Sequence, residues 1–474
     1  MDWDKAEEKL NFLSRLPGDK VVWIIVTLLS MISLVCVFSA SSEMVDADNS
    51  RFDIMGKQFF TMALGGFLIY LCFKVRRIKV FKFFSLFGFV VPFLMLAIVV
   101  TGANLGIVKG GEINHVRRVI CVGGFQIHVY EVTKVAMVMY LAWAVDTFKK
   151  DGFVLLPMLA RFRRLEFLDK PIWKEIVYIF LPITVITVMI LAGGASSAMF
   201  TAAIMVLTIL IGGIDFKHVC LLGVCGILVL GACTGLYMMT KGSEKPLFER
   251  IGVVIGRFSR GGDDGDTSDM GKFMAAAPGS ADYYKALDQI RQPRGARLAV
   301  KEGGIIGKGP GQSTQKYVVA VMCEDYMFSF IVEEYGIVGA ILVLMLYVSL
   351  LARGSLIARN CQNNFAKIAV AGLCLLISGQ AMFHILVNLD CGILTGQTLP
   401  LVSYGTSSFL CFAVAFGIIL SISRMTEEKI QAIQESETPL VPEDLQSPED
   451  EVKDNLSDLS DFESGVEFTD NDIL

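Results

Sequence analysis

Acidic residues cluster in the segment 303–339, where a polar, glycine-rich stretch runs into an apolar one. Glu324 and Asp325 directly precede the apolar run, and Glu333 and Glu334 follow about two helical turns later. Carboxylates are costly at the edge of a membrane span, so those that occur there are typical of functional sites. Burial and like charge could raise the pKa of such a group. We therefore take Asp325 as the candidate catalytic residue and Glu324 as a candidate for supporting it.

The composition indicates a polytopic membrane protein. Hydrophobic side chains make up 54% of the 474 residues, and the mean hydropathy is +0.58, which exceeds the usual values for soluble globular chains. Stretches long enough to cross the hydrocarbon layer predict an all-α fold of about ten transmembrane helices. The predicted spans are 21–40, 59–74, 80–101, 132–148, 176–193, 198–214, 219–239, 326–351, 368–388 and 408–422.

The distribution of charge predicts the orientation and the division of the chain. Lysine and arginine are concentrated before the first predicted span and after the second and fourth, and cationic loops stay on the cytoplasmic side. Both termini are therefore predicted to be cytoplasmic, with a large extracytoplasmic loop at 240–324 between spans seven and eight. We divide the chain into a cytoplasmic segment 1–20, a membrane domain 21–424 and a tail 425–474. The first span has no small-residue cleavage site and is predicted to be retained.

The tail carries sixteen acidic residues and two lysines, so the membrane domain itself is net positive. Segments with little hydrophobicity and high charge cannot bury enough apolar surface to fold alone. We predict an acidic, disordered cytoplasmic tail, which either keeps the protein soluble or docks a partner.

The connection before the fourth predicted span holds several charged residues. Arg117 and Arg118 precede Glu131 and Lys134, and the last two are three residues apart on one helical face, where they can pair. Such a pair could simply neutralise itself. Alternatively, Arg118 and Lys134, with Glu131 beside them, could offer fixed positive charge to a phosphate-bearing ligand.

Two further polar segments lie on the predicted outer side. GGIIGKGPGQSTQK follows a short predicted surface helix and supplies Lys308 and Gln315 as donors for phosphate or sugar oxygens. LDCGILTGQTLPLVSYGTSS carries hydroxyl groups, including Ser403 and Ser407. Non-helical backbone at membrane depth occurs where it is buried in protein or lines a wet cavity, but serine and threonine also serve simply to pack helices closely.

The histidines and cysteines do not show the spacing of a metal site, and metal-binding residues cannot be assigned from the sequence. Each of the four histidines, which include His384, is isolated from the others in the sequence. We therefore expect each to make an ordinary polar contact.

Together these segments resemble the SEDS family (shape, elongation, division and sporulation proteins). GQTLPLVSYGTSS is similar to the family's signature before its last span, GGIIGKGPGQSTQK to its large-loop signature, and EDYMFSFIVEEYGIVG to the start of its eighth span. The resemblance covers nearly the whole membrane region. GKGPGQSTQ and the opening GDKVVWII are closer to the cell-division branch of the family than to its elongation branch.

The resemblance implies a peptidoglycan glycosyltransferase that polymerises lipid II on the outer face of the bacterial cytoplasmic membrane during cell division. Asp325 takes the place of the family's loop aspartate and would act as general base toward the acceptor 4-hydroxyl. Arg118, Lys134 and Lys308 would stabilise the departing diphosphate. A divalent cation, Mg or Mn, is a further candidate for that role, and no organic cofactor is expected.

The implied partners are the lipid II substrate, a class B penicillin-binding protein that acts as transpeptidase, other division proteins and membrane lipid, and no nucleic acid. Two other functions remain open, of which the first fits the polar residues of the spans. One is a lipid II flippase or other transporter, although the sequence shows no internal repeat. The other is a non-catalytic division scaffold, for which the tail and the large loop would suffice.

The sequence departs from the family pattern close to the proposed base. Ala320-Val321 and Cys323-Glu324 replace the family's Pro-Glu and His-Thr, while Val119 and Val129-Tyr130 replace its Trp and Pro-Ser in the first outer connection. We interpret the chain as a divergent member that keeps the activity. Glu324 could then share proton acceptance with Asp325.

Overall fold

The computed structural model describes most of the membrane domain. The described residues are 17–41, 50–102, 104–105, 108–113, 116–122, 125–153, 157–158, 169–191, 193–221, 223, 278–319, 322–391 and 396–437. The chain divides into two compact units, Met1–Thr426 and Glu427–Leu474. Most of the predicted seventh span, the first half of the large loop and the tail beyond 437 lie outside the described residues.

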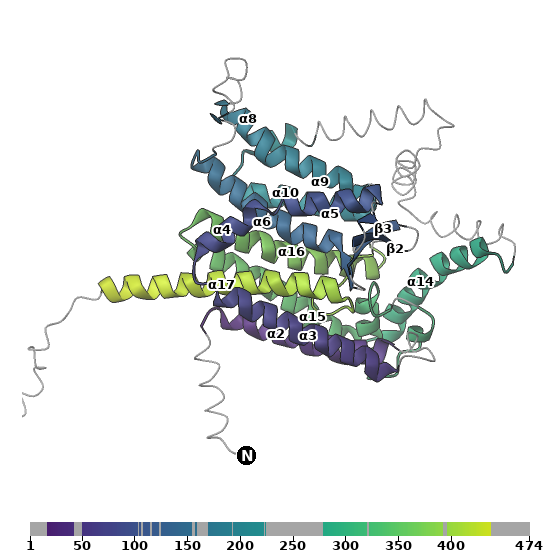
Figure 1. Cartoon of the computed structure of the whole chain (residues 1–474). Coiled ribbons are helices and arrows are strands. Elements are labelled where there is room, and N and C mark those ends of the chain that lie inside the picture. The colour runs from purple at the N-terminus through teal and green to yellow at the C-terminus, as the bar shows by residue number, and fades with distance from the viewer. Residues whose placement is uncertain are drawn as a thin grey trace, which may run out of the picture. The chain divides into compact units, whose positions relative to one another are not determined.

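Helices dominate the first unit (Figure 1). Seven helical stretches among the described residues are long and apolar enough to cross a membrane. They are Lys20–Ala40 (α2), Arg51–Lys74 (α3), Ile78–Leu86 with Val90–Thr101 (α4 and α5), Pro171–Glu175 continuing through Ile176–Phe180 into Leu181–Leu191 (α8 and α9), Met327–Asn360 (α15), Asn364–Asn388 (α16) and Thr406–Glu437 (α17).

Two more helices coincide with predicted spans. Ala195–Ile211 (α10) is apolar but shorter than the others, and Val129–Lys149 (α6) carries buried charged residues. Every predicted span except 219–239, which is described only at its beginning, therefore has a helical counterpart. The predicted all-α polytopic fold is confirmed, and α17 runs past the predicted start of the tail at 425.

The connection between α5 and α6 contains a small antiparallel sheet that the sequence did not predict. Its strands follow one another in the order β1–β2–β3–β4, and β4 leads directly into α6. Contacts of β3 with both α5 and α6 hold the sheet against the ends of these helices. The strands are Asn104–Leu105, Val108–Ile113, Val116–Val122 and Phe125–His128.

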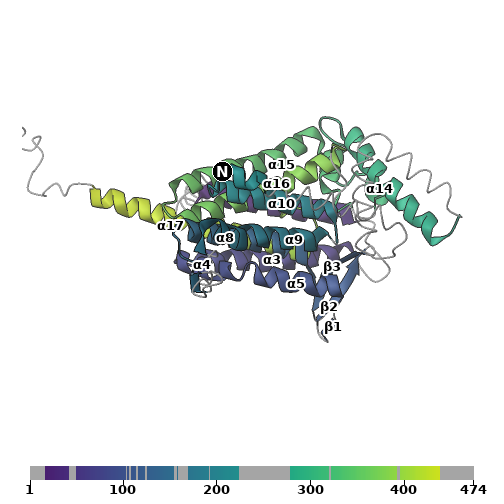
Figure 2. The ribbon, with the colours of Figure 1, turned by 90° about the horizontal axis from the view of Figure 1, so that it is seen from above.

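Helices α16 and α17 form the interior of the bundle. In their most apolar windows 67% and 72% of the residues are buried, against 22–39% in the other long spans, so the other spans present much more of their surface outward. Helix α16 packs against α15, α6 and α10 (Figures 1 and 2). Side chains of α16 can therefore reach the starts of both α15 and α6.

Helix α15 is interrupted at Gly336, whose φ of 66° and ψ of −166° are not helical. A Cβ at this position would lie 2.3 Å from the Ile305 carbonyl oxygen, so only glycine fits. The interruption lets the loop after α14 pair with the helix: the Ile337 amide donates to Gly304 O at 3.0 Å, and the Lys308 amide donates to Glu333 O at 2.9 Å. The loop is thereby fixed to the first turns of α15.

The surface helix predicted in the large loop is longer than expected. It spans Ala281–Gly303 (α14) and contains Pro293. It packs along α15, and a Cβ at Gly303 would lie 2.1 Å from the Val332 carbonyl oxygen. Helix α14 therefore contacts the protein closely at its C-terminal end, beside the α15 segment that carries the acidic residues.

Candidate active site

Asp325 and Glu324 lie partly buried in the turn that leads into α15. Three hydrogen bonds to backbone carbonyls hold this turn. Ser403 Oγ donates to Glu324 O at 2.7 Å, the Tyr404 amide donates to Cys323 O at 2.9 Å, and Asn388 Nδ2 donates to Asp325 O at 3.1 Å. The signature segment before α17 and the end of α16 therefore position the candidate base.

Helix α16 also caps the start of α15. The first amides of a helix have no partner within it, and the N-cap residue Tyr326 makes no side-chain capping bond. Instead, the Phe328 amide donates to His384 Nε2 at 3.4 Å and the Ser329 amide to Asn388 Oδ1 at 2.9 Å. His384 Nδ1 lies 2.7 Å from Gln397 O, which can only accept, so Nδ1 carries the proton. The ordinary polar role predicted for His384 is confirmed.

The Glu324 carboxyl group in this turn has a raised pKa. Burial, followed by the charge of Asp325, raises the pKa of the Glu324 carboxyl to about 7. Glu324 can therefore exchange a proton near neutral pH, while its backbone carbonyl is held by Ser403. This property suits a group that shares protons with a neighbouring base.

Lys134 and Glu131 form the ion pair that their spacing predicted. Lys134 is 2% exposed, and its Nζ donates to Glu131 Oε1 at 2.7 Å, to Gln397 Oε1 at 2.8 Å and to Gln380 Oε1. The Phe200 ring lies 5.6 Å from the same nitrogen. The pairing is confirmed, whereas phosphate binding by Lys134 stays a prediction.

The Lys134 network continues to the start of α15. Gln397 links them, because its side chain accepts from Lys134 and its carbonyl accepts from His384, which caps α15. The second carboxylate oxygen of Glu131 is buried without a hydrogen-bond partner among the described residues. A buried, charged network of this kind is expensive to leave incomplete.

We expect Lys134→Met to lower the free energy of unfolding by about 3 kcal/mol, because it leaves the Glu131 carboxylate buried without its cation. Thermal unfolding in detergent would measure the loss, and Lys134→Met combined with Glu131→Gln should restore part of it. Lys150→Ala is the control: Lys150 also pairs with a buried acid, Asp146, but is itself 52% exposed. Equal unfolding temperatures for Lys134→Met and Lys150→Ala would contradict the argument.

Lys308 and Gln315 contact Glu333, a carboxylate of α15 that is 0% exposed. Glu333 accepts from Lys308 Nζ at 2.7 Å, Ser313 Oγ at 2.5 Å and the Thr314 and Gln315 amides at 2.9 and 3.3 Å. Burial alone would lower the pKa of Lys308, but its bonds to Glu302 and Glu333 outweigh burial and raise it. Lys308 therefore keeps its charge, and its role as a substrate ligand stays a prediction.

Glu334 makes a second set of contacts, which involve the loop and α2. Its Oε1 accepts from Ser39 Oγ of α2 at 2.6 Å, and Lys316 Nζ lies 3.6 Å away. Lys316 also donates to Gly311 O at 2.7 Å. The two adjacent acids thus both contact the glycine-rich loop, and Ser313 binds both of them.

The remaining predicted site residues lie on the first outer connection and the signature segment. Ser407 Oγ accepts from the His128 amide at 3.1 Å, which joins the signature segment to the end of β4. Arg118 lies in β3, and its side chain falls outside the described part of the structure. Its predicted contact with phosphate stays untested.

Three site residues of α16 were not predicted as a group. Gln380, His384 and Asn388 are spaced four residues apart, so they lie on one face of an otherwise apolar helix. Polar residues repeated at this spacing in a buried span are a recognisable signal. Their partners on α6, α15 and the signature segment could be identified only from the structure.

No three His, Cys, Asp or Glu side chains come together as a metal site within the described ranges. Glu324 and Asp325 are adjacent carboxylates in the turn before α15. Mg²⁺ is commonly bound by one or two carboxylates together with substrate phosphates. The oxygen donors of this turn therefore suit a cation that arrives with a phosphorylated ligand.

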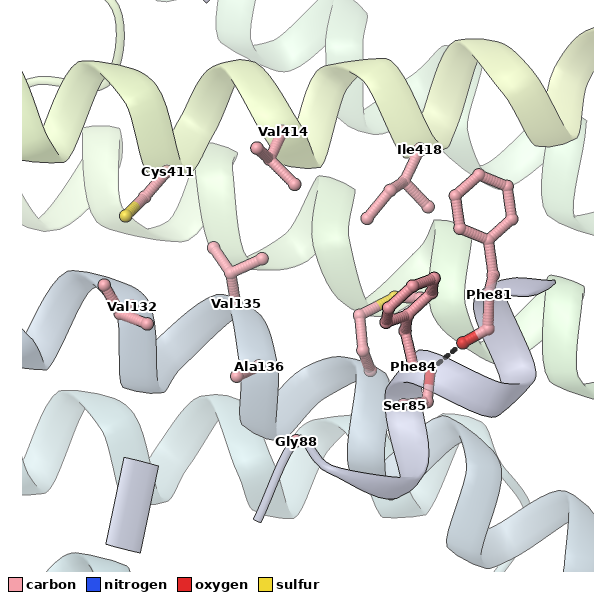
Figure 3. Close-up of a pocket in the computed structure, with 11 residues that line it drawn as sticks. Phe81, Phe84, Ser85, Gly88, Val132, Val135, Ala136, Cys411, Val414 and Ile418 are labelled. Carbon is pink, nitrogen blue, oxygen red and sulfur yellow. Dashed lines mark hydrogen bonds between the residues drawn. The ribbon is translucent and has the colours of Figure 1, made fainter. Parts of the chain in front are cut away.

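An apolar pocket of about 280 Å³ opens between α4, α6 and α17 (Figure 3). Val132 and Val135 of α6 face Val414 and Ile418 of α17 across it. Ser85 also lines the pocket, but its hydroxyl donates to Phe81 O at 2.7 Å. The lining is therefore apolar in character.

One end of this pocket lies near the Lys134 network. Cys411, which lines the pocket, lies near Glu131 and Lys134. The apolar pocket is therefore close to the charged residues at the start of α6.

Comparison with known proteins assigns the chain to a family. A model of the cell cycle protein family FTSW_RODA_SPOVE matches residues 19–249 and 284–428. The chain is 25% identical over 416 residues to a probable peptidoglycan glycosyltransferase FtsW of Coxiella burnetii, covering 85% of this chain and 96% of the relative. It is 26% identical over 408 residues to stage V sporulation protein E of Bacillus subtilis, covering 86% and 97%.

A solved structure shares the fold. It comes from work on the structural coordination of polymerization and crosslinking by a peptidoglycan synthase complex, and it aligns with a TM-score of 0.59 at 19% identity over 87% of this chain and 99% of the other. The site and fold are thus those of a multi-pass membrane protein with a buried polar network. The chain belongs to the FtsW/RodA/SpoVE family of cell cycle proteins, the family that the sequence motifs indicated.

Proposed function

We propose that this protein is a peptidoglycan glycosyltransferase that polymerises lipid II, with Asp325 as general base. The observation that carries the proposal is the Asp325 turn, which the signature segment and α16 hold at the start of α15. Relatives that align over nearly their whole length support it, since one is named a probable peptidoglycan glycosyltransferase.

In the proposed reaction, the 4-hydroxyl oxygen of the acceptor sugar attacks C1 of the donor sugar. The bond between C1 and the lipid diphosphate breaks, and the diphosphate leaves with the electron pair. The hydroxyl proton passes to a carboxylate oxygen of Asp325, which must therefore be ionised at the start. Glu324, which can exchange protons near neutral pH, would pass that proton on to solvent.

Charge on the departing diphosphate needs a counter-charge. Arg118, Lys134 and Lys308 are the proposed cations, but diphosphate would have to compete with the carboxylates that Lys134 and Lys308 already bind. A divalent cation, Mg or Mn, held by Glu324, Asp325 and substrate phosphates would neutralise the same charge. The apolar pocket between α4, α6 and α17 offers a surface for the lipid chain of the substrate.

The proposal places catalysis on the outer face of the cytoplasmic membrane, because cationic connections are expected on the inner side. The resemblance to the cell-division branch of the family supports a location at the division septum. A class B penicillin-binding protein is the proposed partner. The solved structure with the same fold belongs to work on a peptidoglycan synthase complex, which supports a shared assembly for polymerisation and crosslinking.

Purified protein, mixed with labelled lipid II, a class B penicillin-binding protein and divalent cation, tests the function. Glycan chains formed in detergent would support the enzyme. Movement of lipid II across vesicles without polymer would indicate a transporter, and neither product would indicate a scaffold. The latter two outcomes would each overturn the proposal.

We expect the polymerisation rate to rise as the pH rises through about 7, because Glu324, with its raised pKa, is protonated below that value and ionised above it. The Glu324→Gln variant, whose side chain cannot ionise, should lose this step and stay near the low-pH rate of the wild type across the whole range. Rates measured from about pH 5.5 to about 8.5 for both proteins provide the comparison. A step near pH 7 that persists in Glu324→Gln would show that another group causes it.

A further inference from the structure

Asn388 is the side chain that joins α16 to the peptide of the candidate base. It is 2% exposed and lies at the last position of α16. Its Nδ2 donates to Asp325 O at 3.1 Å and to His384 O at 2.9 Å. Its Oδ1 accepts from the amide and the hydroxyl of Ser329, each at 2.9 Å. The two donors and both lone pairs of the oxygen are therefore used.

These partners fix the orientation of the amide. The Ser329 amide can only donate, and the carbonyls of Asp325 and His384 can only accept. The side-chain oxygen must therefore face Ser329, and the nitrogen must face Asp325. Aspartate at this position could accept from Ser329 but could not donate to Asp325, and leucine of similar size could do neither.

We propose that Asn388 is a positioning residue for Asp325, an inference that rests on the proposed function. The carbonyl that Asn388 binds is attached to the same Cα as the catalytic carboxylate. Holding this carbonyl limits rotation of the peptide and thereby sets the direction of the side chain. The side-chain oxygen of Asn388 binds Ser329 at the start of α15. Asn388 therefore connects the Asp325 turn to this helix, so the turn and the helix cannot shift independently.

Three variants separate positioning from simple structural support. Asn388→Leu removes all four bonds. Asn388→Asp keeps the acceptor for the Ser329 amide and loses the donors. Ser329→Ala is the matched control, because it deletes a buried hydrogen bond to the same Asn388 oxygen and leaves the bond to Asp325 in place. Each is assayed as full-length protein with the transpeptidase partner and labelled lipid II, alongside thermal unfolding in detergent.

The expected result is a split between kcat and KM. A catalytic group misplaced by about 1 Å can cost about 10²-fold in rate. We therefore expect folded Asn388→Leu and Asn388→Asp to lose up to about 10²-fold in kcat with the KM for lipid II unchanged. Ser329→Ala should unfold at a lower temperature yet keep the kcat of the wild type.

Two results would overturn the inference while the proposed function stands. One is wild-type kcat in either folded Asn388 variant, and the other is an equal loss of kcat in Ser329→Ala, which would make helix capping the whole role. If Asn388→Leu does not fold, Asn388→Asp still distinguishes positioning of Asp325 from helix capping, because it keeps the acceptor for the Ser329 amide. Absence of glycan from the wild type itself would overturn the proposed function first and this inference with it.

Discussion

We expect Asp325→Asn to reduce lipid II polymerisation by about 10²- to 10⁴-fold, the usual contribution of a general base. Asparagine has nearly the same shape, so the backbone bond from Asn388 to Asp325 can remain, while the amide cannot accept the proton of the acceptor hydroxyl. Glycan formed per minute, measured with the transpeptidase partner and divalent cation present, would report the loss. The unfolding temperature should stay close to that of the wild type.

Asp390→Asn is the matched control for this prediction. Asp390 lies just after α16, and its carboxylate is 52% exposed and pairs with Arg297 at 2.7 Å. Its φ of 62° is a conformation that asparagine tolerates, so this variant should remain folded and active. Wild-type polymerisation by Asp325→Asn would refute the base assignment, and loss of activity only in Glu324→Gln would transfer that role to Glu324.

Local features of the sequence were sufficient to predict the helices and one ion pair. Long apolar runs must form helices in a membrane, because each backbone group has to be hydrogen-bonded internally. The Glu131–Lys134 pair needs only a spacing of three residues on one helix. Such properties depend on neighbours in the chain, so they could be derived without the tertiary fold.

Contacts between distant segments could not be predicted in this way. The sheet between α5 and α6 depends on packing of β3 against two helices. The caps of α15 come from His384 and Asn388, which lie more than fifty residues away. The interruption at Gly336 has meaning only once the loop at Ile305 is seen to pass against it. In each case the deciding partner is determined by the three-dimensional fold.

The same limit applies to the glycine-rich loop. Lys308 and Gln315 were predicted as ligands from residue type alone, since lysine and glutamine suit phosphate and sugar oxygens. The structure places both against Glu333 of α15. The buried Glu333 carboxylate accepts from a lysine, a hydroxyl and two amides, and it thereby organises the backbone of the loop. Any substrate contact would have to be made by loop groups that point away from Glu333.

We expect Glu333→Ala to lower the free energy of unfolding by about 4–5 kcal/mol, more than any other single change considered, because it removes a buried carboxylate from its cation and from several donors. The amides of Thr314 and Gln315 would lose their acceptor, and the loop would separate from α15. Thermal unfolding in detergent measures the first effect, and protease cleavage within 304–317 measures the second. Polymerisation should fall together with loop protection.

Glu302→Ala is the control, since Glu302 binds the same Lys308 nitrogen but is 40% exposed. Exposed pairs contribute only up to about 1 kcal/mol, so this variant should differ little from the wild type in unfolding and in cleavage. If both variants behaved alike, the lysine contact would be the relevant feature and the carboxylate's bonds to the loop backbone would be dispensable. A large effect confined to Glu333→Ala would instead mean that the backbone bonds between α15 and the loop do not suffice, and that the Glu333 carboxylate, eight residues along the chain from the base, is needed to keep the loop in place.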